Sequence, residues 1–268
     1  MKFFAIRSSR RMYNSVLRIG SVVLVALGAC AVFADELPLE RQLAEPDWST
    51  YTAILRKNVA RRATGNFVNY AGIKADARWP GVVRMVAQYQ TAKLNNRNKK
   101  LAFYINAYNV LVIDLIVRNY PVADINQLGD AARPIWKRPV GKVGGREISL
   151  DALENEIVRP FGDPRIHFAL NCGALSCPDL RREAYTSLAL NRQMAEQTRA
   201  FLNNSAKGLR IDAPSGGIVH LSKIFEWFAV DFKSSGGVEA FVRRYRKDIP
   251  PGAQFRTDIE YDWRLNGG

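Results

Sequence analysis

The stretch LAFYINAYNVLVIDLIVRNYP, residues 101–121, is apolar on nearly every side and ends at a proline. A helix that is apolar all round lies either in the core of a protein or in a membrane. Here Asn106, Asn109 and Asp114 interrupt the run, and such polar side chains are costly inside a bilayer. We therefore predict a buried core helix rather than a membrane span, with the rest of the chain folded around it.

Further helices are expected on both sides of this core helix, because apolar residues recur at helical spacing. They are expected over residues 48–62, 78–94, 149–158, 184–204, 223–232 and 237–247. Ser149 is a suitable N-terminal cap for the helix over 149–158, because a serine hydroxyl can accept a hydrogen bond from a free backbone N–H of the first turn.

Strands are expected between these helices. Gly144 and Gly145 suit the tight turn of a hairpin over 133–149, and a second hairpin is expected over 209–222. Residues 66–76 read as a short extended piece and a turn, and short strands are expected over 166–170 and 259–266. The order of elements predicts one α+β domain over residues 45–268, mostly helical, with a small and mainly antiparallel sheet.

The N-terminus has the pattern of an export signal. Residues 1–18 carry five basic residues and no acid, and residues 19–33 are uncharged and mostly apolar. The apolar run is too short to span a bilayer comfortably, and it ends in small residues that suit cleavage after Ala34. We expect a signal peptide over 1–34, no membrane span after its removal, and a mature protein in the periplasm or outside the cell.

Two other forms of export fit the same residues. LGAC, ending at Cys30, loosely resembles the site at which bacterial lipoproteins are lipidated, and SRRMY, from Ser9 to Tyr13, loosely resembles a twin-arginine signal. Cleavage without lipidation ranks first, because the apolar AVFA follows Cys30. All three forms place the domain outside the cytoplasm of a bacterium.

The charge of the chain bears on its partners. Residues 1–34 carry +5 of the net +14, which leaves about +9 on the mature part. A solvated basic surface is the simplest interpretation, and anionic components of the cell envelope are a candidate class of partner. No nucleic-acid partner is expected, since no aromatic and basic motif of a nucleic-acid module is present. No nucleotide-binding or metalloprotease motif is present either, so we expect no cofactor and no metal.

The stretch IHFALNCGALSC, residues 166–177, contains one of the two histidines and two of the three cysteines. Cys172 is the candidate nucleophile, and a thiol needs a base within reach or a lowered pKa to act as one. His167 could be that base only if the chain turns at residues 171–173, which Gly173 makes credible. His220, expected on the second hairpin, is the other candidate.

The same two cysteines allow another interpretation. Cys172 and Cys177 are separated by four residues, and in an oxidising compartment such a pair is a candidate disulfide. The spacing differs from that of thioredoxin-like redox sites and of common zinc sites. A disulfide staple therefore stays open as the alternative to a reactive thiol.

Asn106 and Asn109 lie three residues apart, on one face of the core helix. Buried amides need hydrogen-bond partners, so both either tie the helix to a neighbouring loop or support catalysis by orienting a histidine or polarising a carbonyl. The first interpretation is preferred unless the neighbouring loop carries Cys172. Acids near the cysteines are expected in surface ion pairs; they are Glu154, Glu156 and Asp179, with Arg165, Arg181 and Arg182 as partners.

The motifs NAYN, residues 106–109, and IHFALNCGALSCP, residues 166–178, together with the final IEYDWRLN, resemble the DUF547 family. The resemblance runs from about Asn66 to the end of the chain. The family has no settled biochemical role, and its bacterial members often carry export signals. In plant-type relatives serine can stand at the position matching Cys177, which favours Cys172 as the functional thiol. The content of Cys, His and Asn also invites comparison with papain-like and transglutaminase-like folds.

These observations lead to one preferred function and one alternative. The preferred function is a thiol-dependent acyl transfer or hydrolysis at an amide or thioester of a small molecule or peptide. Cys172 would be the nucleophile and His167 or His220 the base, with Asn106 and Asn109 in support. The alternative is a non-catalytic binding or scaffold domain of the envelope, stapled by a Cys172–Cys177 disulfide.

Overall fold

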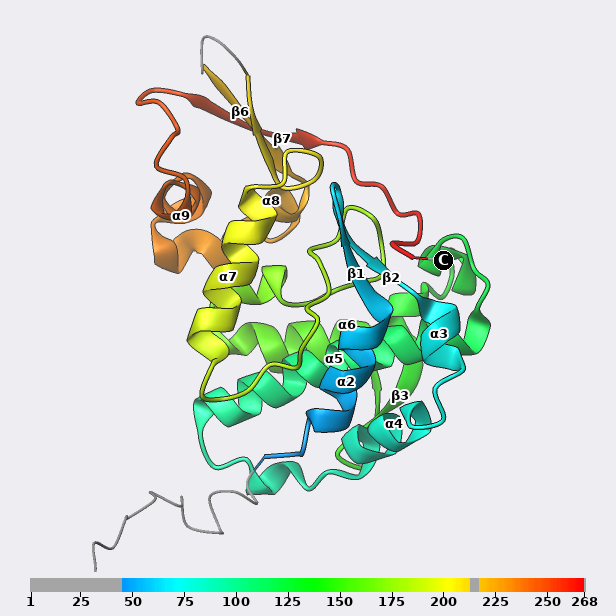
Figure 1. The fold of residues 1–268 in the computed structure, drawn as a ribbon. Coiled ribbons are helices and arrows are strands. Elements are labelled where there is room, and N and C mark those ends of the chain that lie inside the picture. Colours follow the sequence, from blue (N-terminus) through cyan, green and yellow to red (C-terminus); the bar gives the residue numbers. More distant parts are fainter. Residues whose placement is uncertain (1–44, 213–216, 268) are drawn as a thin grey trace, which may run out of the picture. The chain divides into compact units, whose positions relative to one another are not determined.

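The computed structural model describes residues 45–212 and 217–267. The predicted signal peptide, its cleavage site and the lipidation motif at Cys30 lie outside the described residues. The described part is an α+β fold in which helices predominate over small sheets (Figure 1). The predicted fold class is thereby confirmed.

Helix α5, Arg97–Asn119, is the predicted core helix. Asn96 caps its first turn by accepting a hydrogen bond of 2.9 Å from the backbone N–H of Lys99. Fifteen of its residues are buried, among them Asn106 and Asn109. The helix is long and apolar enough to cross a membrane, but 83% of its most apolar window is buried inside the protein, as in a core helix of a globular domain.

The other helices mostly follow the predicted segments, with two corrections: the helix predicted over 48–62 ends at Asn58 and is followed by a strand, and residues 70–74 form a helix where an extended piece and a turn were expected. Their bounds are α2 Ser49–Asn58, α3 Tyr70–Lys74, α4 Trp79–Gln88, α6 Leu150–Ala152, α7 Leu190–Leu202, α8 Ile224–Trp227 and α9 Gly237–Tyr245. Helices α3 and α4 contact α5 directly. Ser149 caps α6 as predicted, since its hydroxyl accepts from the N–H of Ala152 at 3.0 Å.

The hydrophobic residues form two clusters. The larger surrounds α5 and contains the apolar residues of α2, α3 and α4. The smaller is built around Phe168, whose ring packs on Phe201, Phe225 and Phe241 at centroid distances of 5.2, 5.6 and 5.9 Å. Phe168 follows His167 directly, so this second cluster fixes the backbone that carries the predicted histidine.

The described strands form three small sheets. Strands β1, Val59–Arg62, and β2, Gly65–Val68, pair antiparallel, as do β3, Pro139–Val143, and β4, Arg146–Ser149. The third sheet has the order β5–β6–β7, from strands Leu209–Ile211, Ile218–Ser222 and Gln254–Ile259. Strand β6 pairs antiparallel with β5 and parallel with β7. Both predicted hairpins are present, and Gly144 and Gly145 form the first turn with φ of +59° and +84°.

Two predicted strands are wrong. Residues Pro164–Phe168 form a short 3₁₀ helix, because the Asp163 carboxylate accepts from the N–H of Arg165 and Pro164 follows directly, two signals that start a helix. The last strand ends at Ile259, and beyond it the described residues make isolated bridges: Asp124 with Arg264, Ala174 with Leu265 and Val68 with Gly267.

The predicted helix over 149–158 also differs in kind. After α6 the chain forms a π-helical segment, Leu153–Val158, and then a 3₁₀ turn, Arg159–Phe161. A π-helical turn contains an extra residue, which rotates the side chains that follow relative to a regular helix, and such turns are frequent at functional sites. Glu154 lies in this segment.

Candidate active site

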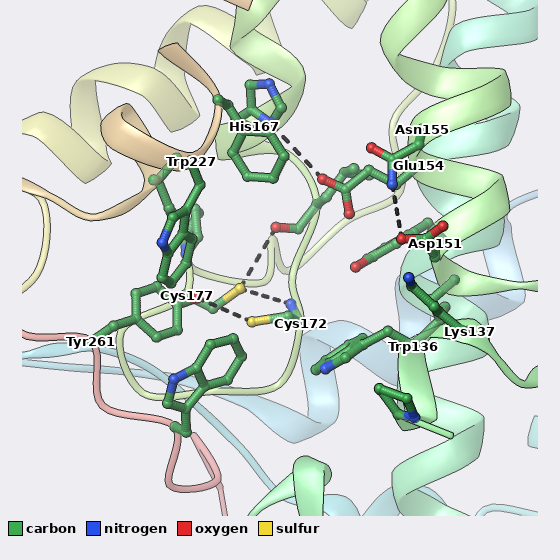
Figure 2. Close-up of a pocket in the computed structure, with 18 residues that line it drawn as sticks. Trp136, Lys137, Asp151, Glu154, Asn155, His167, Cys172, Cys177, Trp227 and Tyr261 are labelled. Atoms are coloured by element: carbon green, nitrogen blue, oxygen red, sulfur yellow. Dashed lines mark hydrogen bonds and ion pairs between the residues drawn. The ribbon is translucent and has the colours of Figure 1, made fainter. Parts of the chain in front are cut away.

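A cavity of about 380 Å³ brings together segments that are far apart in the sequence (Figure 2). Its wall comes from α5, the segment 134–137, α6, the π-helical segment, the 3₁₀ helix Pro164–Phe168, the cysteine-bearing loop of residues 169–178, residues 224–228 and residues 261–263. His167, Cys172 and Cys177 all line it, whereas Asn106, Asn109 and His220 do not. The cavity is of the size that small-molecule sites have.

The cysteine-bearing loop, residues 169–178, is held by Asn109. The Asn109 amide donates to the carbonyl of Ala169 at 3.0 Å and accepts from the N–H of Asn171 at 2.8 Å. Asn171 in turn accepts from the N–H of Gly173 and donates to the carbonyl of Pro178, at 3.1 and 2.7 Å. Gly173 has φ of +83°, so the turn predicted at residues 171–173 is present.

Asn106 makes the same kind of contact with a different loop. Its amide donates to the carbonyl of Tyr185 at 2.8 Å and accepts from the N–H of Tyr185 at 2.9 Å. Both asparagines thus tie α5 to neighbouring backbone, and the loop that Asn109 holds carries Cys172. Neither amide faces the cavity, so a direct role in polarising a substrate has no geometric support.

Cys172 is partly exposed. Its sulfur lies 3.2 Å from the hydroxyl of Tyr261. Burial raises the pKa of this thiol, but interactions with Cys177, with Tyr261 and with the backbone of Ala174 outweigh that effect, so the pKa lies below its ordinary value. A lowered thiol pKa increases the fraction of the nucleophilic thiolate at neutral pH.

Cys177 is buried and supports the backbone of Cys172. Its sulfur accepts a hydrogen bond of 2.7 Å from the N–H of Cys172, and its thiol points to the carbonyl of Leu170 at 3.8 Å. Burial raises the pKa of Cys177 well above its ordinary value. Both thiols are free in this structure.

Lys207 holds the C-terminal half of the same loop, whereas Asn109 holds its N-terminal half. Its ammonium donates to the carbonyls of Leu175 and Cys177 at 3.3 and 2.8 Å and to the carboxylate of Asp179 at 2.5 Å. The Lys207 side chain is only 7% exposed. The prediction that Asp179 pairs with an arginine on the surface is therefore wrong, and no signal in the sequence distinguished Lys207 from other lysines.

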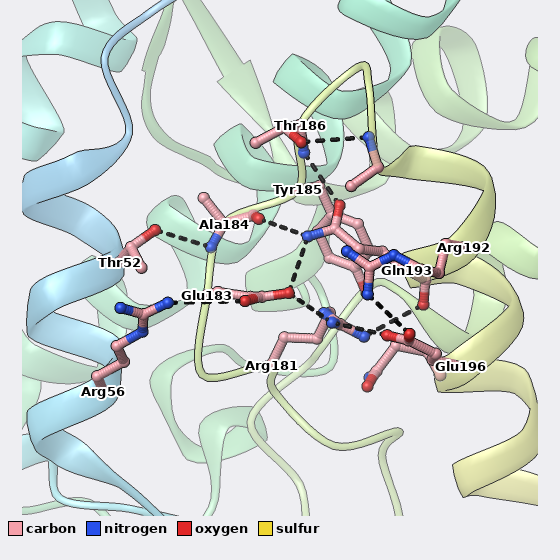
Figure 3. A network of polar contacts seen from close by, with 12 residues as sticks. Thr52, Arg56, Arg181, Glu183, Ala184, Tyr185, Thr186, Arg192, Gln193 and Glu196 are labelled. Atoms are coloured by element: carbon pink, nitrogen blue, oxygen red, sulfur yellow. Dashed lines mark hydrogen bonds and ion pairs between the residues drawn. The ribbon is translucent and has the colours of Figure 1, made fainter.

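The arginines that were expected to pair with these acids have other partners, and Figure 3 shows those of Arg181. Arg181 donates to Glu183 at 2.7 Å and to Glu196 at 3.0 Å, within a network that also includes Gln193 and joins the loop after the cysteines to α7. Arg165 pairs with Asp163, two residues before it. The network is structural, because it lies outside the lining of the cavity.

Glu154 faces the cavity and carries a strongly shifted pKa. Its side chain is 18% exposed, and burial raises its pKa to about 7, against the opposing effects of the Tyr108 hydroxyl and Arg159. A surface ion pair was expected for Glu154, and that expectation is wrong. The π-helical segment accounts for the difference, because a regular helical pattern does not predict which way its residues point.

His167 lies beside Glu154 and is held by a partly buried acid. Its Nε2 lies 2.8 Å from the Asp231 carboxylate, which Arg159 also binds through two hydrogen bonds of 2.7 and 2.8 Å. Phe228 stacks on the imidazole at 4.0 Å. Burial lowers the pKa of His167 despite Asp231, whereas the bond to His167 holds the pKa of Asp231 far below its ordinary value.

These contacts fix the tautomer of His167. A carboxylate can only accept, so the proton of the neutral imidazole lies on Nε2, which donates to Asp231. Nδ1 then presents a lone pair 3.9 Å from the Glu154 carboxyl, too far for a hydrogen bond. Within the described residues Nδ1 has no hydrogen-bond partner. His167 therefore faces Glu154 rather than Cys172.

His220 lies on β6, away from the cavity. It contacts two carboxylates, Asp258 at 2.8 Å and Asp212 at 3.1 Å, and the Asp212 contact is the main reason that its pKa is raised. Over residues 45–212 and 217–267, no hydrogen bond joins Cys172 to either histidine. The structure thus brings His167 into the cavity of Cys172 and leaves His220 outside it.

Aromatic rings surround the cysteine side of the cavity, and no pattern in the sequence predicted this arrangement. Tyr261, which contacts the Cys172 sulfur, packs on Trp227 at a centroid distance of 4.9 Å and on Trp263 at 4.6 Å. Trp263 continues to Trp136 at 6.2 Å. We call these four rings the aromatic arc. No group of three or more possible metal ligands occurs among the described residues.

Comparison with protein-family models matches residues 91–202 to the family described as "Protein of unknown function, DUF547". The matched residues include α5, Glu154, His167 and the cysteine-bearing loop, whereas Asp231 and Tyr261 follow them. No curated protein and no solved structure matches the chain.

Proposed function

With the chain identified through residues 91–202 as a member of the DUF547 family, we propose that it is a thiol enzyme that performs acyl transfer or hydrolysis at an amide or thioester, with Cys172 as nucleophile. The observation that carries the proposal is the placement of the Cys172 thiol, with its lowered pKa, in one cavity with the carboxyl of Glu154, whose pKa is raised to about 7. A nucleophile and a group that exchanges protons near neutral pH are what acyl transfer requires.

Tyr261 supports the nucleophile. A phenolic hydroxyl can donate to a thiolate but gains less from a neutral thiol, so the 3.2 Å contact favours the reactive form of Cys172. The N–H of Cys172 is already bonded to Cys177, so that N–H is not free to bind a substrate oxyanion. In this respect the site differs from one in which the nucleophile's own N–H stabilises the oxyanion.

Glu154 is the proposed proton donor and acceptor. At neutral pH about half of its carboxyl groups are protonated, because the pKa is about 7. His167 would act as a positioning residue, since its Nδ1 faces Glu154 and its Nε2 is held by Asp231. This assignment differs from the expectation that His167 is the base of Cys172, for which the sulfur would have to lie near the imidazole.

The proposed reaction has two steps. The Cys172 thiolate attacks the carbonyl carbon, the bond to the leaving amine or thiol breaks, and the leaving group takes the proton of Glu154. Water then gives a proton back to Glu154 and attacks the thioester on Cys172, which releases the carboxylic acid and restores the thiolate. If a second amine or alcohol replaces water, the outcome is acyl transfer.

The alternative function, a scaffold stapled by a disulfide, uses the same two cysteines. Their proximity supports it, because the Cys177 sulfur lies 2.7 Å from the Cys172 nitrogen. The aromatic arc and the shifted pKa of Glu154 have no role in a staple, so the enzyme is the better proposal. The export of the domain, proposed from residues 1–34, is compatible with both.

Trapping the acyl-enzyme tests the proposal. The full chain is mixed with the N-acetylcysteamine thioester of acetate and quenched in acid, and its intact mass and peptides are measured. We expect an added acetyl group on Cys172 in the wild type and in Cys177→Ser, and none in Cys172→Ser. Glu154→Gln is expected to form the adduct and to lose it more slowly.

Two results would overturn the proposal. One is an acetyl group on several lysines and none on Cys172. The other is a Cys172 that iodoacetamide alkylates no faster than free cysteine at pH 7, combined with equal losses of melting temperature in Cys172→Ser and Cys177→Ser. The second result would support the staple.

A further inference from the structure

The ligand of this cavity can be inferred from its two unlike sides. Figure 2 shows Trp227 and Tyr261 on one side and Lys137, Asp151 and Asn155 on the other. Trp227 lines the cavity and is 46% exposed, so its ring is accessible to a ligand. The aromatic side is continuous, because Trp227 also stacks on Trp263 at 5.9 Å with an interplanar angle of 24°. Such a surface fits the flat, apolar face of a ring.

The opposite side offers hydrogen-bonding groups that are not used within the protein. Asn155 donates to one oxygen of Asp151 at 3.0 Å, which leaves the other oxygen free to accept. Among the described residues, neither that oxygen nor the ammonium of Lys137 has a hydrogen-bond partner. A ligand that fills the cavity therefore needs both donors and acceptors at its edge, and hydroxyl groups supply both.

The charges of the lining residues and the free hydrogen-bonding groups argue against other ligands. Lys137 and Asp151 carry opposite charges, His167 is neutral, and Glu154 is about half protonated near pH 7. A nucleotide needs several cations for its phosphates, and Lys137 is the one lysine or arginine among the described residues that line the cavity. A long acyl chain would cover the free oxygen of the partly buried Asp151 without giving it a hydrogen-bond donor.

Resting on the proposed function, we propose that the ligand is an N-acylated pyranose, that is, an amino sugar whose acyl group Cys172 removes. The apolar C–H face of the sugar ring stacks on the aromatic arc, its hydroxyls bond to Asp151 and Lys137, and its amide carbonyl reaches the sulfur beside Tyr261. The acyl carbon bonds to Sγ as the C–N bond breaks. The sugar leaves as an amine with the proton of Glu154, and water then releases the carboxylic acid.

Binding is measured separately from catalysis in the Cys172→Ser chain. The probe is a β-1,4-linked trimer of N-acetylglucosamine, and the readout is tryptophan fluorescence, to which the arc contributes three of the five tryptophans. Two comparison ligands accompany it, a glucose trimer and an N-octanoyl amide. We expect saturable quenching by the trimer of N-acetylglucosamine and weaker binding of both comparison ligands.

Variants of the arc then locate the site. Trp227→Ala is expected to weaken binding by at least about tenfold, and Trp227→Phe, which keeps a ring, by much less. Asp151→Ala is expected to weaken it as well. Leu188→Ala, at a position that is 91% exposed and outside the cavity, is the matched control and should bind as the parent does. Melting temperatures report whether each variant is folded.

The outcomes separate this inference from the proposed reaction. No quenching by the sugar, while the thioester still acylates Cys172, would overturn the sugar site and leave the thiol enzyme. Tighter binding of the octanoyl amide, or equal binding by folded Trp227→Ala, would overturn the sugar site too. Sugar binding that depends on Trp227, without any acyl group on Cys172 of the wild type, would support the sugar site and overturn the thiol reaction.

Discussion

Replacing Asn109 or Asn106 by alanine tests whether Asn109 positions the loop that carries Cys172, whereas Asn106 stabilises only the fold. The two side chains are equally buried, at 3% and 1% exposure, and each makes one donated and one accepted hydrogen bond to backbone. Their partners differ. Asn109 binds residues 169 and 171 beside Cys172, whereas Asn106 binds Tyr185. Asn106→Ala is therefore the matched control for Asn109→Ala.

The expected cost in stability is similar for both variants. Each substitution leaves one backbone N–H and one carbonyl buried without a partner, and each such group costs about 1–3 kcal/mol. We expect the free energy of unfolding to fall by about 2–6 kcal/mol in either variant, measured by urea denaturation. The reactivity of the thiol should respond only to Asn109, because a released loop loses the geometry that lowers the pKa of Cys172.

The assay is the pH dependence of Cys172 alkylation by iodoacetamide, followed by peptide mass spectrometry under conditions in which each variant is folded. In Asn109→Ala the midpoint is expected to rise toward that of an ordinary thiol by about one pH unit, which corresponds to about 1.4 kcal/mol less stabilisation of the thiolate. In Asn106→Ala it should stay where it is in the wild type. Equal shifts in both variants, or no shift in either, would refute the assignment of Asn109 to the loop.

Three further predictions concern the charged groups. Lys207→Met should lower the free energy of unfolding by about 3–5 kcal/mol, because it leaves Asp179 unpaired, and the double variant with Asp179→Leu should recover much of that loss; a single-variant cost below about 1 kcal/mol would contradict this. Because the folded state raises the pKa of Glu154 from 4.5 to about 7, its contribution to stability is full below pH 4.5 and is lost as the pH rises through 7. Glu154→Gln should therefore be more stable than the wild type at pH 8 by about 3 kcal/mol and not at pH 4, whereas Glu156→Gln, exposed on the same segment, should change little in urea titrations at both values. His220 has a raised pKa, so its contribution is full below pH 6.5 and is lost as the pH rises above it; His220→Gln should destabilise more at pH 5.5 than at pH 8.5 and leave the thiol labelling unchanged.

The parts of the fold that the sequence predicts are those with strong local signals. The core helix is predictable because its apolar run is longer than any strand, and the first hairpin because two glycines adopt the positive φ that its turn needs. The run over 166–170 is too short for periodicity to decide between strand and helix. There the local start signals of Asp163 and Pro164 determined the outcome.

The candidate site is predictable only in part, for a related reason. The turn at Gly173 and the presence of His167 and Cys172 in one cavity follow from residues within one motif. Glu154 also lies nearby in sequence, but the π-helical segment that points it into the cavity leaves no mark in a helical pattern. Trp227 and Tyr261 reach the cavity from segments more than fifty residues away, and only tertiary packing brings them there.

The role of Cys177 can be judged from its hydrogen bond to Cys172 and from the resemblance to the DUF547 family. Its sulfur accepts the N–H of Cys172 and lies in a buried site with its pKa well above the ordinary value, so it acts as a neutral acceptor. A serine hydroxyl can accept the same hydrogen bond but cannot form a disulfide. The occurrence of serine at this position in plant-type relatives, which the resemblance implies, therefore fits a role in shaping the backbone of Cys172. A disulfide staple needs cysteine at both positions. Serine at the position of Cys177 is therefore compatible with Cys172 as a nucleophile and incompatible with a staple.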